Sequence, residues 1–292
     1  RITRAMAYML YTEMVLYQND ESRFGKALQY MKEVIDSNQY SLVSDFKNIW
    51  EESGEWGPES IWEINYISEG GVRDWGAPIA TGGSVYPVLI GIPGYVGNAF
   101  CDGWGFSPVA ETAYTMYEEG DIRRDGGILN FSQHAEATGA SYTARWQDTG
   151  YFLLKYIGRK NGNHGYTADP NLNYGNNQRV YRYAETLLNA AELIVRGAGS
   201  GDAQTYLNAV RTRAQVPMVS ATLDNIIEER HLELMGEGKR YWDLVRSGKA
   251  ESVLTADKHL YRTVNWTPQK KYWPIPQSEI DKSAGTLTQN PY

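Results

Sequence analysis

The chain has 292 residues, of which 42% are hydrophobic and 22% charged, and its formal net charge is −7. This composition excludes a disordered or collagen-like chain, and the length is sufficient to bury a core without disulfides or a structural metal. The acidic balance and the lack of a clustered Lys/Arg block argue against nucleic acid as a partner, and no apolar run is long enough to span a membrane.

Residues 2–17 are predicted to form a helix, because apolar residues recur there at three- and four-residue spacing with no intervening Gly or Pro. A second helix is predicted over residues 24–36, after a short polar link. Two helices joined in this way predict an antiparallel hairpin, and we assign residues 1–40 to this helix pair. The chain opens with Arg1 directly in a helical pattern, so we expect either a processed protein or a piece of a longer one.

Residues 51–178 are predicted to be a loop-rich region, because they contain many of the Gly residues and several Pro. Short strands are predicted at residues 60–66 and 151–157. An irregular region of this length is usually functional or disordered, and its many Trp and Tyr residues argue against disorder. We therefore expect any ligand site to lie in this region, carried by a helical scaffold.

Residues 180–214 repeat the plan of the first hairpin, with a Gly-rich link at 197–201 between two helical patterns. When the two hairpins are superposed, Ala7 falls on Ala184 and Ala27 on Ala203, which is typical of close helix approach. The pattern resembles tetratricopeptide-type pairing with about 34 residues per unit. Because such stacks need at least three units, we expect further helices to come from elsewhere.

Residues 222–247 are predicted to form one long helix with Thr222 as its N-cap. Opposite charges at three- and four-residue spacing along it can pair, and those among apolar residues need partners. We interpret them as an internal salt-bridge lattice that fixes helix packing, and we assign Trp62 and Trp242 to the core. The charged residues are Glu229, Arg230, Glu233, Glu237, Arg240, Asp243 and Arg246.

The motifs of common enzyme classes are absent. No HExxH zinc motif and no GxSxG nucleophile motif occurs, and the four histidines are dispersed. The single cysteine, Cys101, can form neither an internal disulfide nor a cysteine-rich zinc site, so we expect no cofactor and no metal. The carboxylates Glu118, Glu119 and Asp121 are typical of a solvated helix end, although a glycoside hydrolase would need two such groups facing each other.

Several sequence motifs occur together in a fixed order. Residues 182–192 read RYAETLLNAAE, residues 208–214 read NAVRTRA, and residues 229–246 read ERHLELMGEGKRYWDLVR. The chain then continues through PIP at 274–276 to QNPY at 289–292. Together with the central segments GWGF at 103–106 and DIR at 121–123, these motifs resemble those of the SusD/RagB family over nearly the whole chain.

This resemblance implies a mainly α fold in one domain over residues 1–292: a tetratricopeptide-like superhelix of helical hairpins with a long loop-rich ligand-binding insertion and a few short strands. Family members are lipid-anchored proteins on the outer-membrane surface of Bacteroidetes. They bind glycans or other nutrients, are not enzymes, and cover a SusC-like TonB-dependent transporter. Because the family proteins are longer, the resemblance implies that this chain is a C-terminal part and that the lipid anchor lies upstream.

A sugar ring presents a face of C–H bonds and a rim of hydroxyl groups, so Trp or Tyr beside planar polar side chains suits it. The loop-rich region offers one such group, and we predict that it binds the ligand. A second choice is Tyr142, Arg145 and Trp146. The predicted ligand-binding residues are Arg73, Asp74, Trp75, Tyr86, Tyr95 and Trp104.

The sequence thus predicts a glycan-binding subunit that delivers oligosaccharide to an outer-membrane transporter. Two alternatives stay open at this point. One is a glycoside hydrolase that uses loop carboxylates, and the other is a helical-repeat adaptor that binds protein and has no aromatic loop surface.

Overall fold

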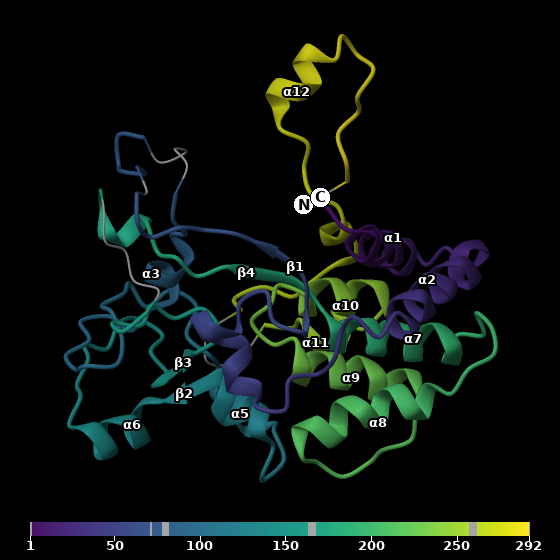
Figure 1. The fold of residues 1–292 in the computed structure, drawn as a ribbon. Helices are drawn as coiled ribbons and strands as arrows, with labels where there is room; N and C mark the ends of the chain where they lie inside the picture. The colour runs from purple at the N-terminus through teal and green to yellow at the C-terminus, as the bar shows by residue number, and fades with distance from the viewer. Residues whose placement is uncertain (1, 71, 78–81, 163–167, 257–261, 292) are drawn as a thin grey trace.

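The computed structural model describes residues 2–70, 72–77, 82–162, 168–256 and 262–291. It is mainly helical, with a few short strands. Figure 1 shows helical hairpins gathered on one side and the irregular region, with its short elements α3, α5 and α6, on the other. In the described part of the chain, no helix combines the length and the apolar character needed to cross a membrane.

The first hairpin agrees with its prediction. It consists of α1 (Arg4–Gln18), the 3₁₀ turn η1 (Glu21–Arg23) and α2 (Phe24–Asp36). The Thr3 hydroxyl caps the start of α1, and Asn19 ends it in the left-handed conformation at φ 52°. Apolar residues on the facing sides of both helices form a core in which Met9 and Met31 are fully buried.

The second hairpin, α7 (Tyr183–Val195) and α8 (Ala203–Ala214), is also present as predicted. Helix α2 packs against α7, so the two hairpins lie side by side. Ala27, Ala184 and Ala203 are buried where the helices approach, as expected. Ala7 is exposed, so its predicted role in close packing is wrong; Ala5, two positions earlier, is buried instead.

The strands form two small antiparallel sheets, one of β1 (Ser60–Ile64) with β4 (Gln178–Arg182) and one of β2 (Ile128–Asn130) with β3 (Tyr151–Leu153). The predicted strands at 60–66 and 151–157 are therefore shorter than expected. Strand β4 was not predicted, because its apolar residues run directly into the pattern of α7. The β1–β4 pair brings residue 60 to Arg182 across more than a hundred residues of intervening chain.

The loop-rich region holds several short elements around an aromatic core. Trp50 and Tyr156 pack edge to face at 5.4 Å within this core, and Phe46 is also buried there. Much of the high aromatic content therefore fills the core of this region. The elements are η2 (Phe46–Trp50), η3 (Glu52–Gly54), α3 (Tyr86–Ile90), α4 (Glu111–Thr115), α5 (Ile122–Gly127), α6 (Phe131–Thr138) and η4 (Pro170–Leu172).

The predicted long helix is wrong in one respect: it is two helices, α9 (Leu223–Glu233) and α10 (Arg240–Arg246). Thr222 caps α9 as expected, by accepting from the Asn225 amide. Gly236 and Gly238 lie at φ 78° and 77°, and a right-handed helix cannot pass through residues in that conformation. At Gly236 a Cβ atom would also lie 2.6 Å from Leu153, so the turn fits closely against β3.

After α10 the chain forms α11 (Ala250–Val253), η5 (Pro268–Lys271) and α12 (Gln277–Lys282). The segment around α12 extends away from the body, near both chain ends in Figure 1. The Tyr241 hydroxyl donates to the Lys270 carbonyl oxygen at 2.8 Å and holds its base. Trp273 on this segment is 69% exposed.

Truncating a buried side chain at the centre of the hairpin stack should strongly destabilise the protein. Leu188 on α7 is fully buried among α7, α8 and α9. We expect Leu188→Ala to lower the free energy of unfolding by about 2–5 kcal/mol, because the cavity adds to the lost burial. Urea denaturation measures this. Val96→Ala, at a position that is 68% exposed, should change it by less than about 0.5 kcal/mol.

Candidate functional site

Two of the predicted ligand-binding residues, Trp75 and Trp104, lie together on the surface. Their rings are stacked, with centroids 5.8 Å apart and planes inclined by 20°. Phe106 continues the surface, 6.0 Å from Trp104. The Arg145 guanidinium lies over Phe106 at 5.3 Å and also donates to the Trp104 carbonyl oxygen. We call Trp75, Trp104, Phe106 and Arg145 the aromatic platform.

The platform joins residues from three separate loops. Arg145 belonged to the second predicted cluster, so the structure merges part of that cluster with the first. Trp146 beside it is 82% exposed. Phe106 was missed, although it stands two residues after Trp104 in the GWGF segment, where alternation along an extended chain could have indicated it.

Trp104 is held by its backbone. The amides of Trp104 and Phe106 donate to the carbonyl oxygens of Val88 and Leu89 in α3, at 2.7 and 2.8 Å. Gly103 lies so close to Gly91 that a Cβ atom would stand 2.3 Å from the Gly91 carbonyl carbon. The segment that carries Trp104 is therefore tied to the last turn of α3, and the ring projects from a fixed support.

Arg73 and Asp74 lie beside Trp75 in the sequence, and both make hydrogen bonds that hold the Trp75 loop. One carboxylate oxygen of Asp74 accepts from the amides of Gly76 and Ala77, at 2.7 and 2.8 Å, which closes a turn after Trp75. The Arg73 carbonyl oxygen accepts from the side-chain amide of Asn173 at 2.7 Å. These two residues thus shape the loop that presents Trp75.

Tyr95 and Tyr86 do not join the platform. Tyr95 is only 7% exposed, packs against Phe100 and Phe131, and its hydroxyl lies 3.0 Å from His134 Nε2. Tyr86 is half-buried with its ring 5.4 Å from Tyr156, and burial raises the pKa of its phenol. We correct Tyr95 to a packing residue, because a glycan cannot reach a ring that the core covers.

Tyr142 is also mainly a packing residue. Its ring lies 4.3 Å from that of Phe131 and 5.3 Å from that of Phe152. Its hydroxyl donates to Asp148 at 2.7 Å, and burial with this hydrogen bond raises the pKa of Tyr142 to about 12. Of the second predicted cluster, only Arg145 and Trp146 are therefore open to a ligand.

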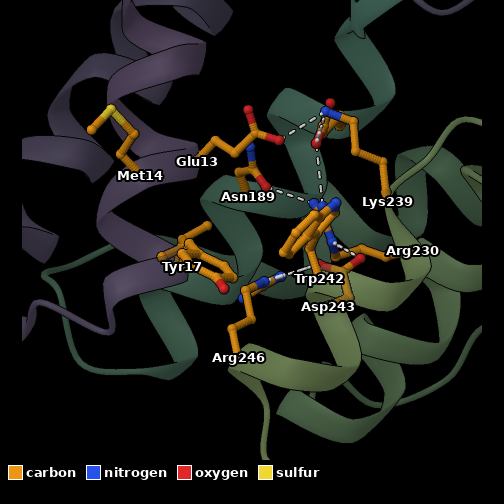
Figure 2. A pocket seen from close by; sticks show the side chains of 11 residues that line it. Glu13, Met14, Tyr17, Asn189, Arg230, Lys239, Trp242, Asp243 and Arg246 are labelled. Carbon is orange, nitrogen blue, oxygen red and sulfur yellow. Dashed lines mark hydrogen bonds and ion pairs between the residues drawn. The ribbon is translucent and has the colours of Figure 1, made fainter. Parts of the chain in front are cut away.

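A separate cavity of about 310 Å³ lies between α1 and α10. Figure 2 shows Met14 and Tyr17 of α1 on one side and Trp242 of α10 on the other. Trp242 is 38% exposed, so its assignment to the core is wrong; Trp62 packs, partly buried, against the first hairpin core. The charged groups at the cavity are paired with one another, such as Arg230 with Asp243 at 2.9 Å.

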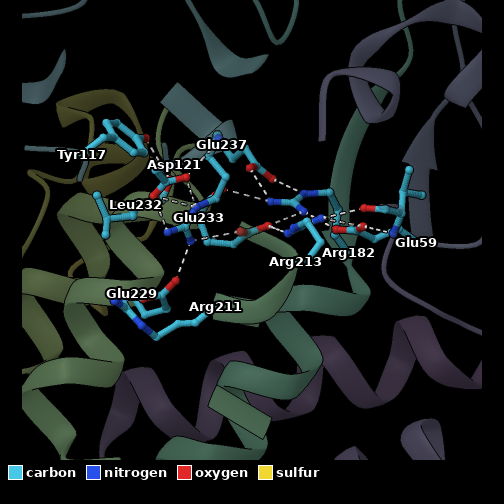
Figure 3. A network of polar contacts seen from close by, with 12 residues as sticks. Glu59, Tyr117, Asp121, Arg182, Arg211, Arg213, Glu229, Leu232, Glu233 and Glu237 are labelled. Atoms are coloured by element: carbon cyan, nitrogen blue, oxygen red, sulfur yellow. Dashed lines mark hydrogen bonds and ion pairs between the residues drawn. The ribbon is translucent and has the colours of Figure 1, made fainter. Parts of the chain in front are cut away.

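The charges of the two helices α9 and α10 form the internal lattice that the sequence predicts. Figure 3 shows its centre, where the buried Glu233 carboxylate accepts from Arg182 at 2.8 Å and from Arg213 at 2.5 Å. Glu237 accepts from Arg182 and from Lys155, the latter at 2.7 Å. Arg240 is the exception among the predicted members, since its ion pair is with the half-exposed Glu228 at 3.5 Å.

The loop carboxylates also belong to this lattice. Asp121 is 2% exposed and accepts from Arg123 at 2.7 Å, and Glu118 accepts from Arg211 at 2.9 Å. Their ion pairs give both a structural role. The prediction of a solvated helix end is therefore wrong for Asp121, whereas the Glu118 side chain is 49% exposed.

The sequence also matches a known protein family. The profile of the SusD family matches residues 58–292. The chain belongs to the SusD family. Glycan-binding proteins of this family are not catalytic, so the glycoside hydrolase alternative is wrong.

The solved SusD-family structures include near relatives. Surface glycan-binding protein A from Bacteroides thetaiotaomicron is 52% identical with a TM-score of 0.95, and one of its structures contains laminarihexaose. This chain is covered completely and spans 64% of that protein. A laminarin-binding SusD-like protein is 33% identical with a TM-score of 0.84; the chain spans 63% of it.

A curated relative, SusD-like protein P38 from Formosa agariphila, is 28% identical over 302 residues. The match covers 89% of this chain and 54% of that relative. The chain therefore spans little more than half the length of this relative.

The lattice predicts a pH-dependent stability. Burial alone would raise the pKa of the Glu237 carboxyl, but the charges of Arg182 and Lys155 outweigh burial and lower it below the ordinary 4.5. A lowered folded-state pKa stabilises the protein above about pH 4.5, and this contribution is lost as pH falls towards the folded-state value. We expect Glu237→Gln to lower the free energy of unfolding by about 3–5 kcal/mol at pH 7, because the buried cations Arg182 and Lys155 each lose an anionic partner.

Urea unfolding of both proteins between pH 3 and pH 7 measures this effect. The loss in Glu237→Gln should shrink as the pH falls below about 4.5. Glu279→Gln is the matched control, since that 52% exposed side chain pairs with Lys282 on the surface. This control should lower the free energy of unfolding by less than about 1 kcal/mol. An equal loss in the two variants would contradict the structural role of the lattice.

Proposed function

We propose that this chain is the glycan-binding part of a cell-surface protein, and that its ligand is a β-glucan of the laminarin type. The single observation that carries the proposal is the aromatic platform, whose two nearly parallel indole rings suit the C–H faces of consecutive glucose residues. The Arg145 guanidinium at its edge can donate to sugar hydroxyls. The ligand class is supported by the relative that was solved with laminarihexaose.

We also propose that the whole protein is lipid-anchored at the outer membrane and passes its oligosaccharide to a SusC-like TonB-dependent transporter. Membership of the SusD family supports this role. The exposed platform favours it over a protein-binding adaptor, because such an adaptor needs no aromatic loop surface. Co-purification of the transporter from outer membranes with the full-length protein tests the partnership, and its absence would contradict it.

Replacing the platform tryptophans by alanine tests whether the platform binds laminarihexaose. We expect Trp75→Ala and Trp104→Ala each to weaken laminarihexaose binding by about tenfold or more, which is about 1.4 kcal/mol per lost ring. Isothermal titration calorimetry on the full-length polypeptide measures the Kd. Trp273→Ala is the control, because this 69% exposed indole lies on the segment around α12, away from the platform. Unchanged binding in both platform variants would overturn the proposed site.

For the domain organisation, we propose that the hairpins are tetratricopeptide-like units and that further helices of a longer polypeptide cover the α1–α10 cavity. Leu10 and Met14 leave an apolar ridge on α1 that is 43% and 54% exposed, and Trp242 continues it. Stacks of this kind need at least three units, and the relatives are substantially longer than this chain. A buried ridge would remove this apolar surface from water.

Thiol labelling shows whether the α1–α10 cavity is covered or open in the longer polypeptide. In a Cys101→Ser background, we expect Met14→Cys to react quickly in the 292-residue chain and slowly in the longer polypeptide. Val96→Cys, at a position that is 68% exposed in the loop-rich region, should react at the same rate in both. Equal rates for Met14→Cys in the two proteins would mean that the cavity stays open.

A further inference from the structure

Trp75 is 60% exposed, so the core does not fix its orientation. Its indole Nε1–H donates to one carboxylate oxygen of Asp169 at 2.5 Å, across 94 residues of chain. The other Asp169 oxygen accepts from the Asn171 amide at 2.9 Å and caps the short helix η4. Asp169 therefore joins the exposed indole to a small regular element elsewhere in the loop-rich region.

The backbone around Asp169 is anchored in turn by Asn173, which is completely buried. The Asn173 side-chain amide donates to the carbonyl oxygens of Arg73 and Asp169, at 2.7 and 2.9 Å. Its side-chain oxygen accepts from the Gly83 amide at 3.3 Å. One buried side chain thus binds both sides of the loop that carries Trp75 and also the residue that holds its ring.

The segment at Gly83 and Ser84 packs closely against the segment at Asn173 and Tyr174. A Cβ atom on Gly83 would lie 2.0 Å from the Asn173 Cα atom, so the two backbones touch. Ser84 and Tyr174 exchange backbone hydrogen bonds of 2.7 and 3.1 Å directly beyond them. The segment that supports Trp75 thus continues directly into α3, whose carbonyl oxygens hold Trp104.

We infer that Asp169 is a positioning residue, which sets the inclination of the Trp75 indole to Trp104 and thereby prepares the platform for a β-glucan. The inference rests on the proposed glycan-binding function. With its N–H bound to Asp169, the indole offers a ligand its flat face and not a hydrogen bond. A ring fixed before binding loses less rotational freedom when the sugar arrives, so affinity is higher than for a mobile ring.

The decisive variant is Asp169→Ser. Serine caps a helix about as well as aspartate, so η4 keeps its N-terminal hydrogen bond, but the shorter side chain cannot reach the indole. We expect the variant to bind laminarihexaose about tenfold more weakly in the full-length polypeptide. Asp169→Asn keeps one acceptor oxygen for the two N–H groups that Asp169 accepts from, so we expect its Kd to lie between those of wild type and Asp169→Ser. Binding by Asp169→Ser that equals wild type would overturn the inference.

A double-mutant cycle separates positioning from general loop damage. If Asp169 acts through Trp75, Asp169→Ser should have no further effect on binding in a Trp75→Ala background. The same loss in both backgrounds would overturn the inference, because Asp169 would then act through another group.

A second measurement keeps the test valid if wild type does not bind laminarihexaose, a result that would reject the proposed ligand. The Trp75 indole N–H resonance, assigned by its loss in Trp75→Phe, reports the hydrogen bond directly. We expect it to shift in Asp169→Ser, because the indole N–H loses its acceptor. An unshifted resonance in Asp169→Ser would overturn the positioning role whatever the ligand.

Discussion

A completely buried carboxylate, that of Glu233, holds the two sides of this molecule together. It accepts hydrogen bonds from Arg213 of α8, Arg182 of β4 and Arg123 of α5. Moving such charges out of water is expensive, and the cost is offset only when each has well-placed partners. Helix α9 can therefore occupy one position relative to these three elements. Glu233 and its neighbour Glu237 thus tie Arg123 and Lys155 of the loop-rich region to the helices.

The aromatic platform depends on that attachment in an indirect way. Its rings stand on loops, and hydrogen bonds tie each loop to a short helical element. Trp104 rests on α3 through its backbone, and Trp75 rests on η4 through its side chain. One ring of the platform is thus held through its backbone and the other through its side chain, and both supports belong to the loop-rich region.

Sequence patterns predicted the parts of the structure that follow from local periodicity. Both hairpins, the cap at Thr222 and the charged lattice along residues 229–246 are present. The break between α9 and α10 was missed because helical spacing continues across it, although Gly236 and Gly238 offered a local indication. Tyr95 was wrongly predicted to bind the ligand. The sequence of a Gly-rich segment does not show whether a tyrosine ring in it faces a ligand or the core.

The platform could be predicted only in part, for a physical reason. Trp75 and Trp104 stood out as aromatic residues in a polar loop context. Their partners are set by contacts between distant segments, as with Asp169, which lies 94 residues after Trp75. The spacing of residues along the sequence does not indicate a contact between such distant segments. Phe106 is the one missed platform residue that alternation along the chain could have revealed.

Asn173 contacts both Arg73 and Gly83, and this affects how the loop between them can vary among related proteins. A loop whose two ends are fastened at one buried residue can change in length between those ends at little entropic cost, since closure cost grows only slowly with length. Insertions there would alter what stands beside Trp75 while the base of the loop stays in register. The surface around Trp75 can therefore diverge through this one segment, without any change in the helical stack.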